Sequence, residues 1–311
     1  MDALDGDPWT ISSLVSQTGL RLRDILHFYR MGGRNEVWLL LASGRSYVIK
    51  VFTYQGIFGA QLELLIDRYL PSRAESWVVD ADLEVPALIW RTPSQMTLWR
   101  EMYSDPSGAQ LIRRAKQVAT MLAEIHSLDF DLPLSTLVHG PSSTNDPDAL
   151  PVSPAQLMLL LLLDRLGINQ TDSVEAGSTL VHGDVRLTNI IVTDIEAWLI
   201  DFETLGTGHP ESDLAQIIVD VIAAEVRSRR VRSTMAHHFG VTLLDQYSSC
   251  HRVRLDIRRL AAYSVSCLIS NALEYERGRE RVALESLALI EMAYRLYSGP
   301  DGYERFNWIK T

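Results

Sequence analysis

Three polar side chains between residues 184 and 201 have the types and the spacing that phosphate transfer requires. Asp184 follows a short apolar stretch, Asn189 comes five positions later, and Asp201 follows the apolar Trp198-Leu199-Ile200. A carboxylate can orient an attacking hydroxyl and accept its proton, and hard oxygen ligands can hold Mg²⁺ beside an anionic phosphate. The pattern therefore predicts Asp184 as the catalytic base and Asn189 and Asp201 as magnesium ligands.

The tripeptide His182-Gly183-Asp184 taken alone is also typical of a turn in which the aspartate caps a helix. Asn189 follows that turn directly before an apolar strand pattern, and Asp201 ends the next one. Because a plain turn explains neither of these additional residues, the set favours the catalytic interpretation.

The elements that must position these residues change character once along the chain. The first hundred residues are rich in strand patterns, and alternation around Ala42-Ser43-Gly44-Arg45 predicts a hairpin. A helix is expected before Pro71, because apolar residues recur there at helical spacing. The expected elements of this half are strands over 37–41, 46–52, 86–90 and 96–102 and a helix over 61–70.

Helical periodicity dominates the remainder of the chain, interrupted by one hairpin around Thr193-Asp194-Ile195-Glu196. Apolar spacing predicts an amphipathic helix ending near His126 and a buried helix over 154–166. The order of the expected strands and helices along the chain indicates an α+β, two-lobed fold with a small antiparallel sheet and a mostly helical second half. We expect a nucleotide-binding lobe over 1–103 and a helical lobe over 104–311 that carries the catalytic loop and the acceptor site.

The motif H-G-D-x-x-x-x-N followed by I-D-F-E resembles the aminoglycoside phosphotransferase and choline-kinase-like family, which shares the protein-kinase-like fold. The resemblance implies ATP or GTP and Mg²⁺ as cofactors and a small-molecule hydroxyl as the phosphate acceptor. Glu203 stands where protein kinases carry the glycine of Asp-Phe-Gly, which puts kinase-type flip regulation in doubt. By the same resemblance Asp213 is expected to be structural and to cap the helix that follows it.

The resemblance also implies two nucleotide-binding segments in the first hundred residues. A glycine-containing loop before the hairpin corresponds to the family's nucleotide loop, although two glycines before a strand are also typical of a plain turn. The hinge between the lobes is expected where backbone groups would meet the adenine or guanine edge. The residues implied for these two segments are Gly32, Gly33 and Asn35 in the loop and Glu101, Met102 and Tyr103 in the hinge.

Lys50 lies inside the apolar, alternating stretch Tyr47-Val48-Ile49-Lys50-Val51. Buried lysines are rare unless they are paired, so a lysine on an exposed sheet edge is the alternative interpretation. The resemblance implies that Lys50 holds the nucleotide phosphates and pairs with a glutamate on the following helix. Glu63 is the candidate for that glutamate, with Glu75 as the second choice.

The acceptor site is the least specified part of the sequence. Acidic residues on late helices bind cationic substrates in the resembled family, and this implies Glu274 and Glu276 as acceptor contacts, although a solvated helix face is the alternative interpretation. Glu203, two positions after Asp201, is a further candidate acceptor contact. The expected acceptor is a cationic or amino-sugar-like antibiotic. A metabolic or biosynthetic kinase acting on choline, homoserine, methylthioribose or a secondary metabolite is the alternative, and a catalytically silent nucleotide-binding module is a third hypothesis.

The composition excludes several other classes of protein. The net charge is −10 and we find no basic stripe, which argues against a nucleic-acid partner. The longest apolar run, over 157–163, is too short to span a bilayer, and the acidic N-terminus does not resemble a secretory signal. With only two cysteines, a cytoplasmic protein is expected, as a monomer or a homodimer.

Overall fold

The computed structural model describes twelve stretches of the chain. These are residues 25–31, 36–42, 45–51, 78–82, 87–92, 97–104, 109–128, 152–168, 177, 179–228, 235–250 and 255–298. The side chains of a few residues inside these stretches are not described. The contacts divide the chain into two compact units. Unit 1 comprises Met1–Met96 and Asp201–Glu203, and unit 2 comprises Thr97–Ile200 and Thr204–Thr311.

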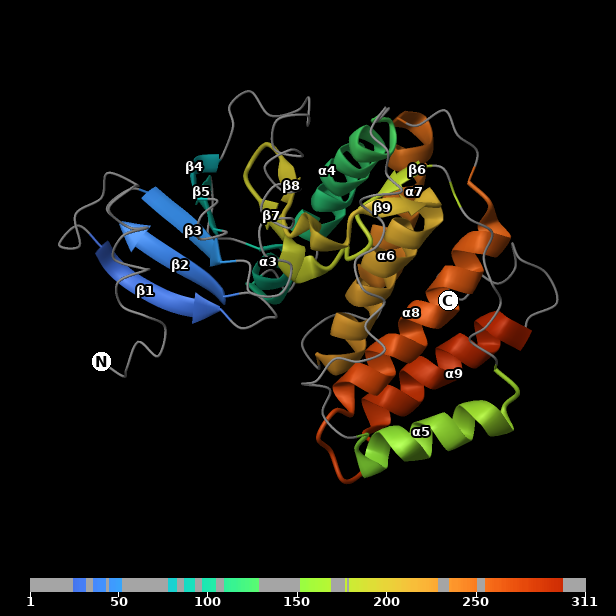
Figure 1. Cartoon of the computed structure of the whole chain (residues 1–311). Coiled ribbons are helices and arrows are strands. Elements are labelled where there is room, and N and C mark those ends of the chain that lie inside the picture. Colours follow the sequence, from blue (N-terminus) through green and yellow to red (C-terminus); the bar gives the residue numbers. More distant parts are fainter. Residues whose placement is uncertain are drawn as a thin grey trace. The chain divides into compact units, whose positions relative to one another are not determined.

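The described strands of unit 1 form an antiparallel five-stranded sheet with the order β1-β2-β3-β5-β4 (Figure 1). Its strands are β1 (Ile25–Met31), β2 (Glu36–Ala42), β3 (Arg45–Val51), β4 (Val78–Asp82) and β5 (Ala87–Thr92). The hairpin predicted around residues 42–45 is confirmed, because Ala42 pairs with Arg45 across the turn. The sequence did not predict β1 and β4, each of which pairs along one side only within the described sheet.

The core of unit 1 lies on one face of this sheet. Alternate residues of the three inner strands are buried there, as expected from the two-residue period of a strand, and they are Trp38, Leu40, Tyr47, Ile49, Ala87 and Ile89. Lys50 follows Ile49 on the central strand β3 and therefore points to the opposite face. Only 4% of Lys50 is exposed, so the edge-lysine interpretation is wrong.

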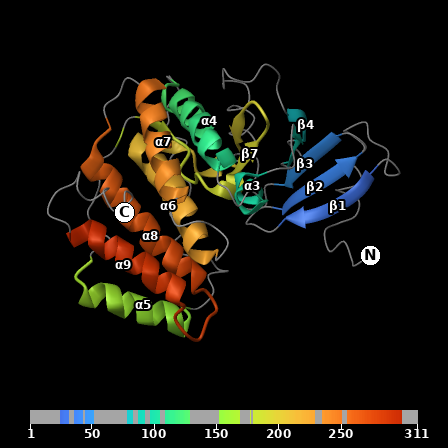
Figure 2. The same ribbon diagram turned by 180° about the vertical axis from the view of Figure 1, so that it is seen from behind.

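The described part of unit 2 contains the long helices, two short strand pairs and an isolated bridge between Thr97 and Ile191. The helices are α3 (Leu98–Ser104), α4 (Ala109–His126), α5 (Pro154–Arg165), α6 (Pro210–Arg227), α7 (Met235–Cys250), α8 (Ile257–Tyr275) and α9 (Leu284–Ser298). Helix α6 packs against both α7 and α8, while α7 also packs on α4 and α8 on α9 (Figures 1 and 2). Helix α6 therefore lies at the centre of the unit, with buried residues along most of its length.

The strands of unit 2 hold the predicted catalytic loop between them. Strand β6 (Thr179–Val181) pairs with β9 (Gly206–Gly208), and β7 (Ile190–Val192) pairs with β8 (Ala197–Leu199). The hairpin predicted around residues 193–196 is confirmed. Short 3₁₀ turns lie on the two sides of that hairpin, at Leu187–Asn189 and Phe202–Thr204.

The predicted strand over 96–102 is wrong, because residues 98–104 form helix α3. The rings of Trp99 and Tyr103, one turn apart, lie 4.6 Å from each other, and Glu101 forms a buried ion pair with Arg114 of α4. The ring contact joins residues four positions apart and so fits helical spacing, and the ion pair attaches α3 to α4. The contact division consequently falls between Met96 and Thr97, earlier than the boundary expected at 103/104.

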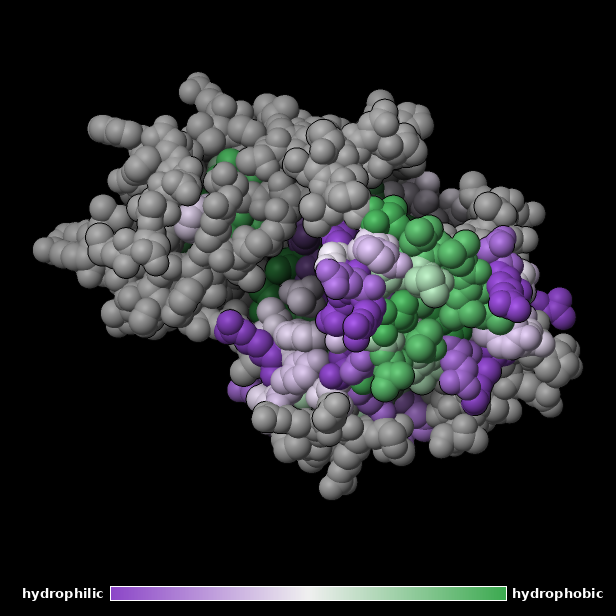
Figure 3. Space-filling model, turned by 90° about the horizontal axis from the view of Figure 1, so that it is seen from below, coloured by the Kyte–Doolittle hydropathy of each residue, from purple (hydrophilic) through white to green (hydrophobic). Residues whose placement is uncertain are grey.

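Helix α5 begins as the sequence predicts but is less buried than expected. Ser153 and Gln156 form a reciprocal capping box, and Pro154 occupies the first turn, where it costs no hydrogen bond. Ala155, Leu159 and Leu163 pack inward, whereas Leu157 and Leu161 are more than half exposed. Figure 3 looks from below, the side on which α5 lies in Figure 1, and shows apolar side chains gathered on this surface. The apolar run predicted burial on all sides, but only one face has a packing partner among the described residues.

No helix in the described part of the chain has the length and apolarity needed to cross a bilayer.

Candidate functional site

The loop from His182 to Asn189 leaves β6 through a glycine with a left-handed backbone. Gly183 has φ +82°, and a Cβ at this position would lie 2.6 Å from the carbonyl oxygen of Thr204. The Thr204 hydroxyl in turn donates to the carbonyl oxygen of His182 at 2.8 Å. Only glycine combines that conformation with that close approach, so the middle residue of His-Gly-Asp is required by the backbone.

Helix α6 holds the first part of this loop through a buried carboxylate. The backbone N–H groups of His182 and Gly183 donate to the two carboxylate oxygens of Asp213, at 2.7 and 2.9 Å. His126 of α4 contacts the same carboxylate through Nε2 at 3.0 Å, and its Nδ1 lies 2.8 Å from the Tyr247 hydroxyl. The role predicted for Asp213 as a helix cap is wrong, since it lies inside α6 and binds the catalytic loop. His126 is itself buried.

The pKa of the Asp213 carboxyl is lowered from its usual value. Complete burial acts to raise it, but the hydrogen bond and charge of His126, the charge of His182 and the Gly183 N–H together outweigh burial. Asp213 is therefore an ionised group at neutral pH that fixes the start of the loop.

Gln216, one turn after Asp213, brackets Asp184 from both sides. Its carboxamide nitrogen donates to the Gly183 carbonyl at 2.6 Å, and its carboxamide oxygen accepts from the Val185 N–H at 2.7 Å. One side chain thus hydrogen-bonds the residues immediately before and after the predicted base. Asp220 extends the series by accepting from the Leu187 N–H at 2.7 Å.

Asp213, Gln216 and Asp220 share one face of α6 because they are three and four positions apart. We call these three residues the α6 rail. The rail binds four backbone N–H groups of the catalytic loop, which would otherwise be buried or half-buried donors without partners. The loop conformation is thus imposed by one helix face.

Asp184 has a hydrogen-bond donor on each carboxylate oxygen. The carboxamide nitrogen of Asn189 donates to Oδ2 at 3.0 Å and to the Asp184 carbonyl at 3.1 Å. Nε of Arg186 donates to Oδ1 at 2.7 Å. The Asp184 side chain is 31% exposed, so it is oriented by two neighbours and still accessible.

The same hydrogen bonds orient Asn189 for a second role. Because its nitrogen faces Asp184, its carboxamide oxygen faces away from Asp184. The Ile200 N–H donates to the Asn189 carbonyl at 2.9 Å, so the β7–β8 hairpin pairs Asn189 with the residue preceding Asp201. An amide oxygen and a carboxylate fit the hard-oxygen donors that Mg²⁺ prefers.

Asp201 and Lys50 belong to unit 1 and contact each other there. The Lys50 ammonium forms an ion pair with the Asp201 carboxylate. Asp201 has φ +71°, which is uncommon outside glycine and is best tolerated by Asp and Asn. The expected partner Glu63, the loop residues Gly32, Gly33 and Asn35, and the side chain of Glu203 lie outside the described residues.

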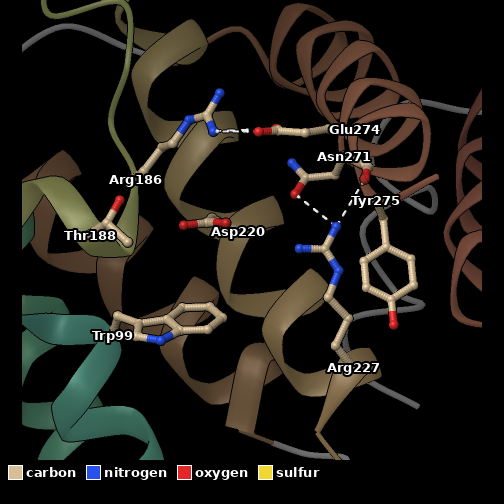
Figure 4. A pocket seen from close by; sticks show the side chains of 8 residues that line it. All are labelled: Trp99, Arg186, Thr188, Asp220, Arg227, Asn271, Glu274 and Tyr275. Atoms are coloured by element: carbon tan, nitrogen blue, oxygen red, sulfur yellow. Dashed lines mark hydrogen bonds and ion pairs between the residues drawn. The ribbon is translucent and has the colours of Figure 1, made fainter. Parts of the chain in front are cut away.

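A cavity of about 350 Å³ opens beside Arg186 within unit 2 (Figure 4). Trp99 of α3 and Tyr275 of α8 supply aromatic walls, and Thr188 and Asn271 add neutral polar groups. Since Arg186 both lines this cavity and donates to Asp184, the predicted base lies one side chain away from it.

Two acids and two arginines complete the lining, namely Arg186, Asp220, Arg227 and Glu274. Arg186 Nη1 lies 3.3 Å from both oxygens of Glu274, and the exposed pair is consistent with weak mutual stabilisation. The pKa of Arg186 is raised, because the carboxylates of Asp184 and Glu274 outweigh burial, which lowers it. Burial raises the pKa of the Asp220 carboxyl, against the Leu187 N–H and the charges of Arg186 and Arg227.

The structure separates the predicted acceptor residues. Glu274 lines the cavity, as an acceptor contact would. The prediction for Glu276 is wrong: this residue is fully buried beyond the end of α8 and accepts from the Ala283 N–H and the Ser286 hydroxyl. Helix α8 ends at Tyr275 and Glu276 is its C-cap, so Glu274 and Glu276 lie on the two sides of the helix end and point in different directions.

The hinge prediction for Glu101, Met102 and Tyr103 is also wrong, because all three lie in helix α3. The Glu101 N–H donates to the Thr97 carbonyl at 3.1 Å, and its carbonyl accepts from the Ser104 hydroxyl. Glu101 and Met102 are buried. The backbone N–H and carbonyl of Glu101 are thus used within the helix and are not free to meet a purine edge.

Sequence reasoning missed Arg186, Gln216, Asp220 and Arg227. The sequence contained a pattern that could have indicated the three α6 residues among them. The segment that forms α6 carries a second, polar stripe at helical spacing, separate from its apolar stripe. This polar stripe consists of Asp213, Gln216, Asp220 and Arg227. A polar face on a largely buried helix requires partners. Here the partners are the catalytic loop and the cavity.

Replacing Gln216 by Glu is expected to lower kcat for phosphate transfer about tenfold while changing the nucleotide KM little. The variant retains an acceptor for the Val185 N–H but places a carboxylate against the Gly183 carbonyl, so Asp184 loses its bracket. Steady-state kinetics measure the change in kcat and in the nucleotide KM.

Gln156 provides a matched control, because its carboxamide also bridges two backbone groups, Ser153 N–H at 2.9 Å and the Leu273 carbonyl at 2.9 Å. Gln156→Glu should change the melting temperature similarly and leave kcat intact. Equal kcat losses in the two variants would mean that Gln216 has only a structural role.

The model of the phosphotransferase enzyme family matches residues 27–250, which is more than half of the chain. No curated protein matches the chain.

Solved structures with the same fold include the choline kinase LicA from Streptococcus pneumoniae, at 19% identity and TM-score 0.52, covering 93% of this chain and 98% of that one. A streptomycin–ATP–APH(2")-IIa ternary complex matches at 18% identity and TM-score 0.52, with coverages of 88% and 94%. A thermostable mutant of aminoglycoside phosphotransferase APH(4)-Ia, in a complex with ADP and hygromycin B, matches at 16% identity and TM-score 0.55, with coverages of 93% and 98%.

These likenesses show the two-lobed protein-kinase-like fold that was expected from the sequence. The family match extends through the catalytic loop, the α6 rail and Asp201. The chain therefore belongs to the phosphotransferase enzyme family.

Proposed function

We propose that this phosphotransferase moves the γ-phosphate of ATP or GTP to a hydroxyl of a small molecule bound in the cavity beside Arg186. One observation carries the proposal: Asp184 is oriented by Asn189 and Arg186, and Arg186 also lines the cavity. The acceptor hydroxyl would attack the γ-phosphorus while the bond to the bridging oxygen breaks. The hydroxyl proton would pass to Asp184.

The other residues of the set have binding roles in this proposal. Lys50 would hold the nucleotide phosphates. Its ion pair with Asp201 supports this role, because the pair keeps the buried Lys50 ammonium in a fixed position. Asn189 and Asp201 would hold Mg²⁺, which supplies positive charge to offset the charge on the transferring phosphate. Two of the solved structures of this fold contain ATP or ADP, which supports a nucleotide donor.

Glu274 and Asp220 support an acceptor that carries an amine, because both carboxylates line the cavity. The solved relatives include choline kinases and aminoglycoside phosphotransferases, so their names support an amino alcohol and an amino sugar equally. We propose an amino-sugar-like antibiotic or a metabolic amino alcohol as the acceptor. A silent nucleotide-binding module fits less well, because Asp184, Asn189 and Asp201 are all present.

The proposal is tested by incubating the purified chain with Mg²⁺ and ATP or GTP and a panel of aminoglycosides, nucleoside antibiotics, sugars and amino alcohols. Mass spectrometry should detect one acceptor that gains a phosphate. Growth of an expressing strain on antibiotic plates then separates a resistance enzyme from a metabolic one. Nucleotide binding without transfer to any acceptor would favour the silent module.

A further inference from the structure

Arg227 is a half-buried cation in the cavity wall with no carboxylate paired to it among the described residues. It lies at the end of α6, and its guanidinium is stacked over the Tyr275 ring at 4.7 Å. Nη2 donates to the Asn271 carbonyl at 2.9 Å. Within the described part of the chain, the Nε atom is buried without a hydrogen-bond partner.

Arg186, the second arginine of the cavity, differs from Arg227 because it is paired with carboxylates. Arg186 contacts Asp184 and Glu274, so its charge and that of Glu274 offset each other. Asp220 is the remaining acid, and one of its oxygens accepts from Leu187. Burial raises the pKa of Asp220 and the charge of Arg227 only opposes that rise, and the two side chains form no ion pair among the described residues. Arg227 is thus the cation of the cavity whose charge is least compensated.

Tyr275 and Asn271 hold the guanidinium in one orientation, and this pre-organises it for a ligand. Figure 4 shows the side chain of Arg227 beside Tyr275, with Asp220 and Arg186 across the cavity. A fixed guanidinium presents a planar fork of donors that matches a carboxylate or a phosphate.

We propose that Arg227 is an anion subsite, so that the phosphate acceptor carries an anionic group, a carboxylate or a phosphate ester, in addition to its hydroxyl. This inference rests on the proposed function, because it takes the cavity to be the acceptor site. Asp220, across the cavity, would receive the amine of the same molecule. The acceptor is then zwitterionic, and 350 Å³ is within the size range of small-molecule sites.

The test compares pairs of molecules that differ only by the anionic group, using calorimetric binding to the full chain without nucleotide. L-Homoserine and 3-amino-1-propanol differ by a carboxylate, and glucosamine 6-phosphate and glucosamine differ by a phosphate ester. The parent is expected to bind the anionic member of one pair at least about tenfold more tightly, as charge-assisted hydrogen bonds predict. Which pair shows the preference identifies the anionic group.

In Arg227→Gln, the ratio of the affinities for the anionic and the neutral member of the pair should fall close to one. Arg227→Lys should restore part of this preference, because it returns the positive charge without the planar fork of donors. Arg279→Gln is the matched control: Arg279 also stacks on Tyr275, at 4.3 Å, but does not line the cavity. Its variant should keep the parent's preference. Equal binding within both pairs, no binding of either anionic probe, or a preference unchanged in Arg227→Gln would overturn the subsite.

The binding measurement is independent of catalysis, so the two proposals can fail separately. A preference that depends on Arg227, without phosphate transfer to any acceptor, would leave the subsite standing and reject the proposed function. Transfer to an acceptor without an anionic group, together with equal binding within both pairs, would reject the subsite and leave the proposed function standing.

Discussion

Replacing Asp184 by Ala is expected to lower kcat for phosphate transfer by at least about a thousandfold. The substitution removes the carboxylate that would orient the acceptor hydroxyl and take its proton. The α6 rail binds only backbone groups around Asp184, so the loop should keep its conformation. Steady-state kinetics on the best acceptor, together with thermal unfolding, measure the effect.

Asp184→Asn refines the result, because it retains the size of the side chain and removes the charge. Its amide would also place a donor against Asn189 or Arg186, where both present donors now. The control is Asp194→Ala, since Asp194 is exposed in the turn between β7 and β8. A parental kcat in Asp184→Ala would refute the assignment of the base, and an equal loss in Asp194→Ala would indicate a nonspecific effect.

Replacing Asp213 by Asn is expected to reduce the free energy of unfolding at pH 7 by about 3 kcal/mol. The carboxylate is fully buried and binds two backbone N–H groups and His126. An amide at this position offers one acceptor where the loop requires two, and it loses the charge beside His126. Denaturant unfolding measures the difference from the parent.

The difference should depend on pH in a defined direction. A carboxyl whose pKa is lower in the folded protein contributes stability above its unfolded pKa and loses it as the pH falls through the folded value. With the unfolded value near 3.9, the parent and Asp213→Asn should converge below about pH 4. Among the described residues, the titratable groups that interact with the Asp213 charge include His126, His182, Tyr247, Tyr263 and Cys267, and all of them remain in the variant.

Asp245→Asn, on the exposed side of α7, is the control and should follow the parent at every pH. A difference between the parent and Asp213→Asn that grows on acidification would contradict the lowered pKa of Asp213.

Local patterns in the sequence predicted the elements that short-range physics specifies. The hairpin of β2 and β3, the helix ending at His126 and the capped start of α5 depend on alternation, helical spacing and turn residues within a few positions. The order of Asp184, Asn189 and Asp201 was also readable, since a loop and a hairpin join them directly. The family match agrees with the function class inferred from that order.

Segment 96–102 shows where local patterns fail. Its apolar residues fit a strand or a helix equally, and the pairing of Glu101 with Arg114, 13 positions away, accompanies the helix. Strands β1 and β4 were missed for a related reason, because each acquires its hydrogen bonds from a partner strand. Short ambiguous segments depend on contacts that a local window does not contain.

The composition and order of residues from His182 to Asp201 were sufficient to specify the reaction class, because phosphate transfer requires few groups and these lie close along the chain. The neighbours of Asp184 depended on folding over longer distances: Arg186 meets Glu274 across 88 positions, and Gln216 brackets the loop across 31 to 33. Glu274 and Glu276 are two residues apart, yet one lines the cavity and the other is buried. Side-chain direction at the end of a helix follows from packing, and packing joins residues that the sequence keeps far apart.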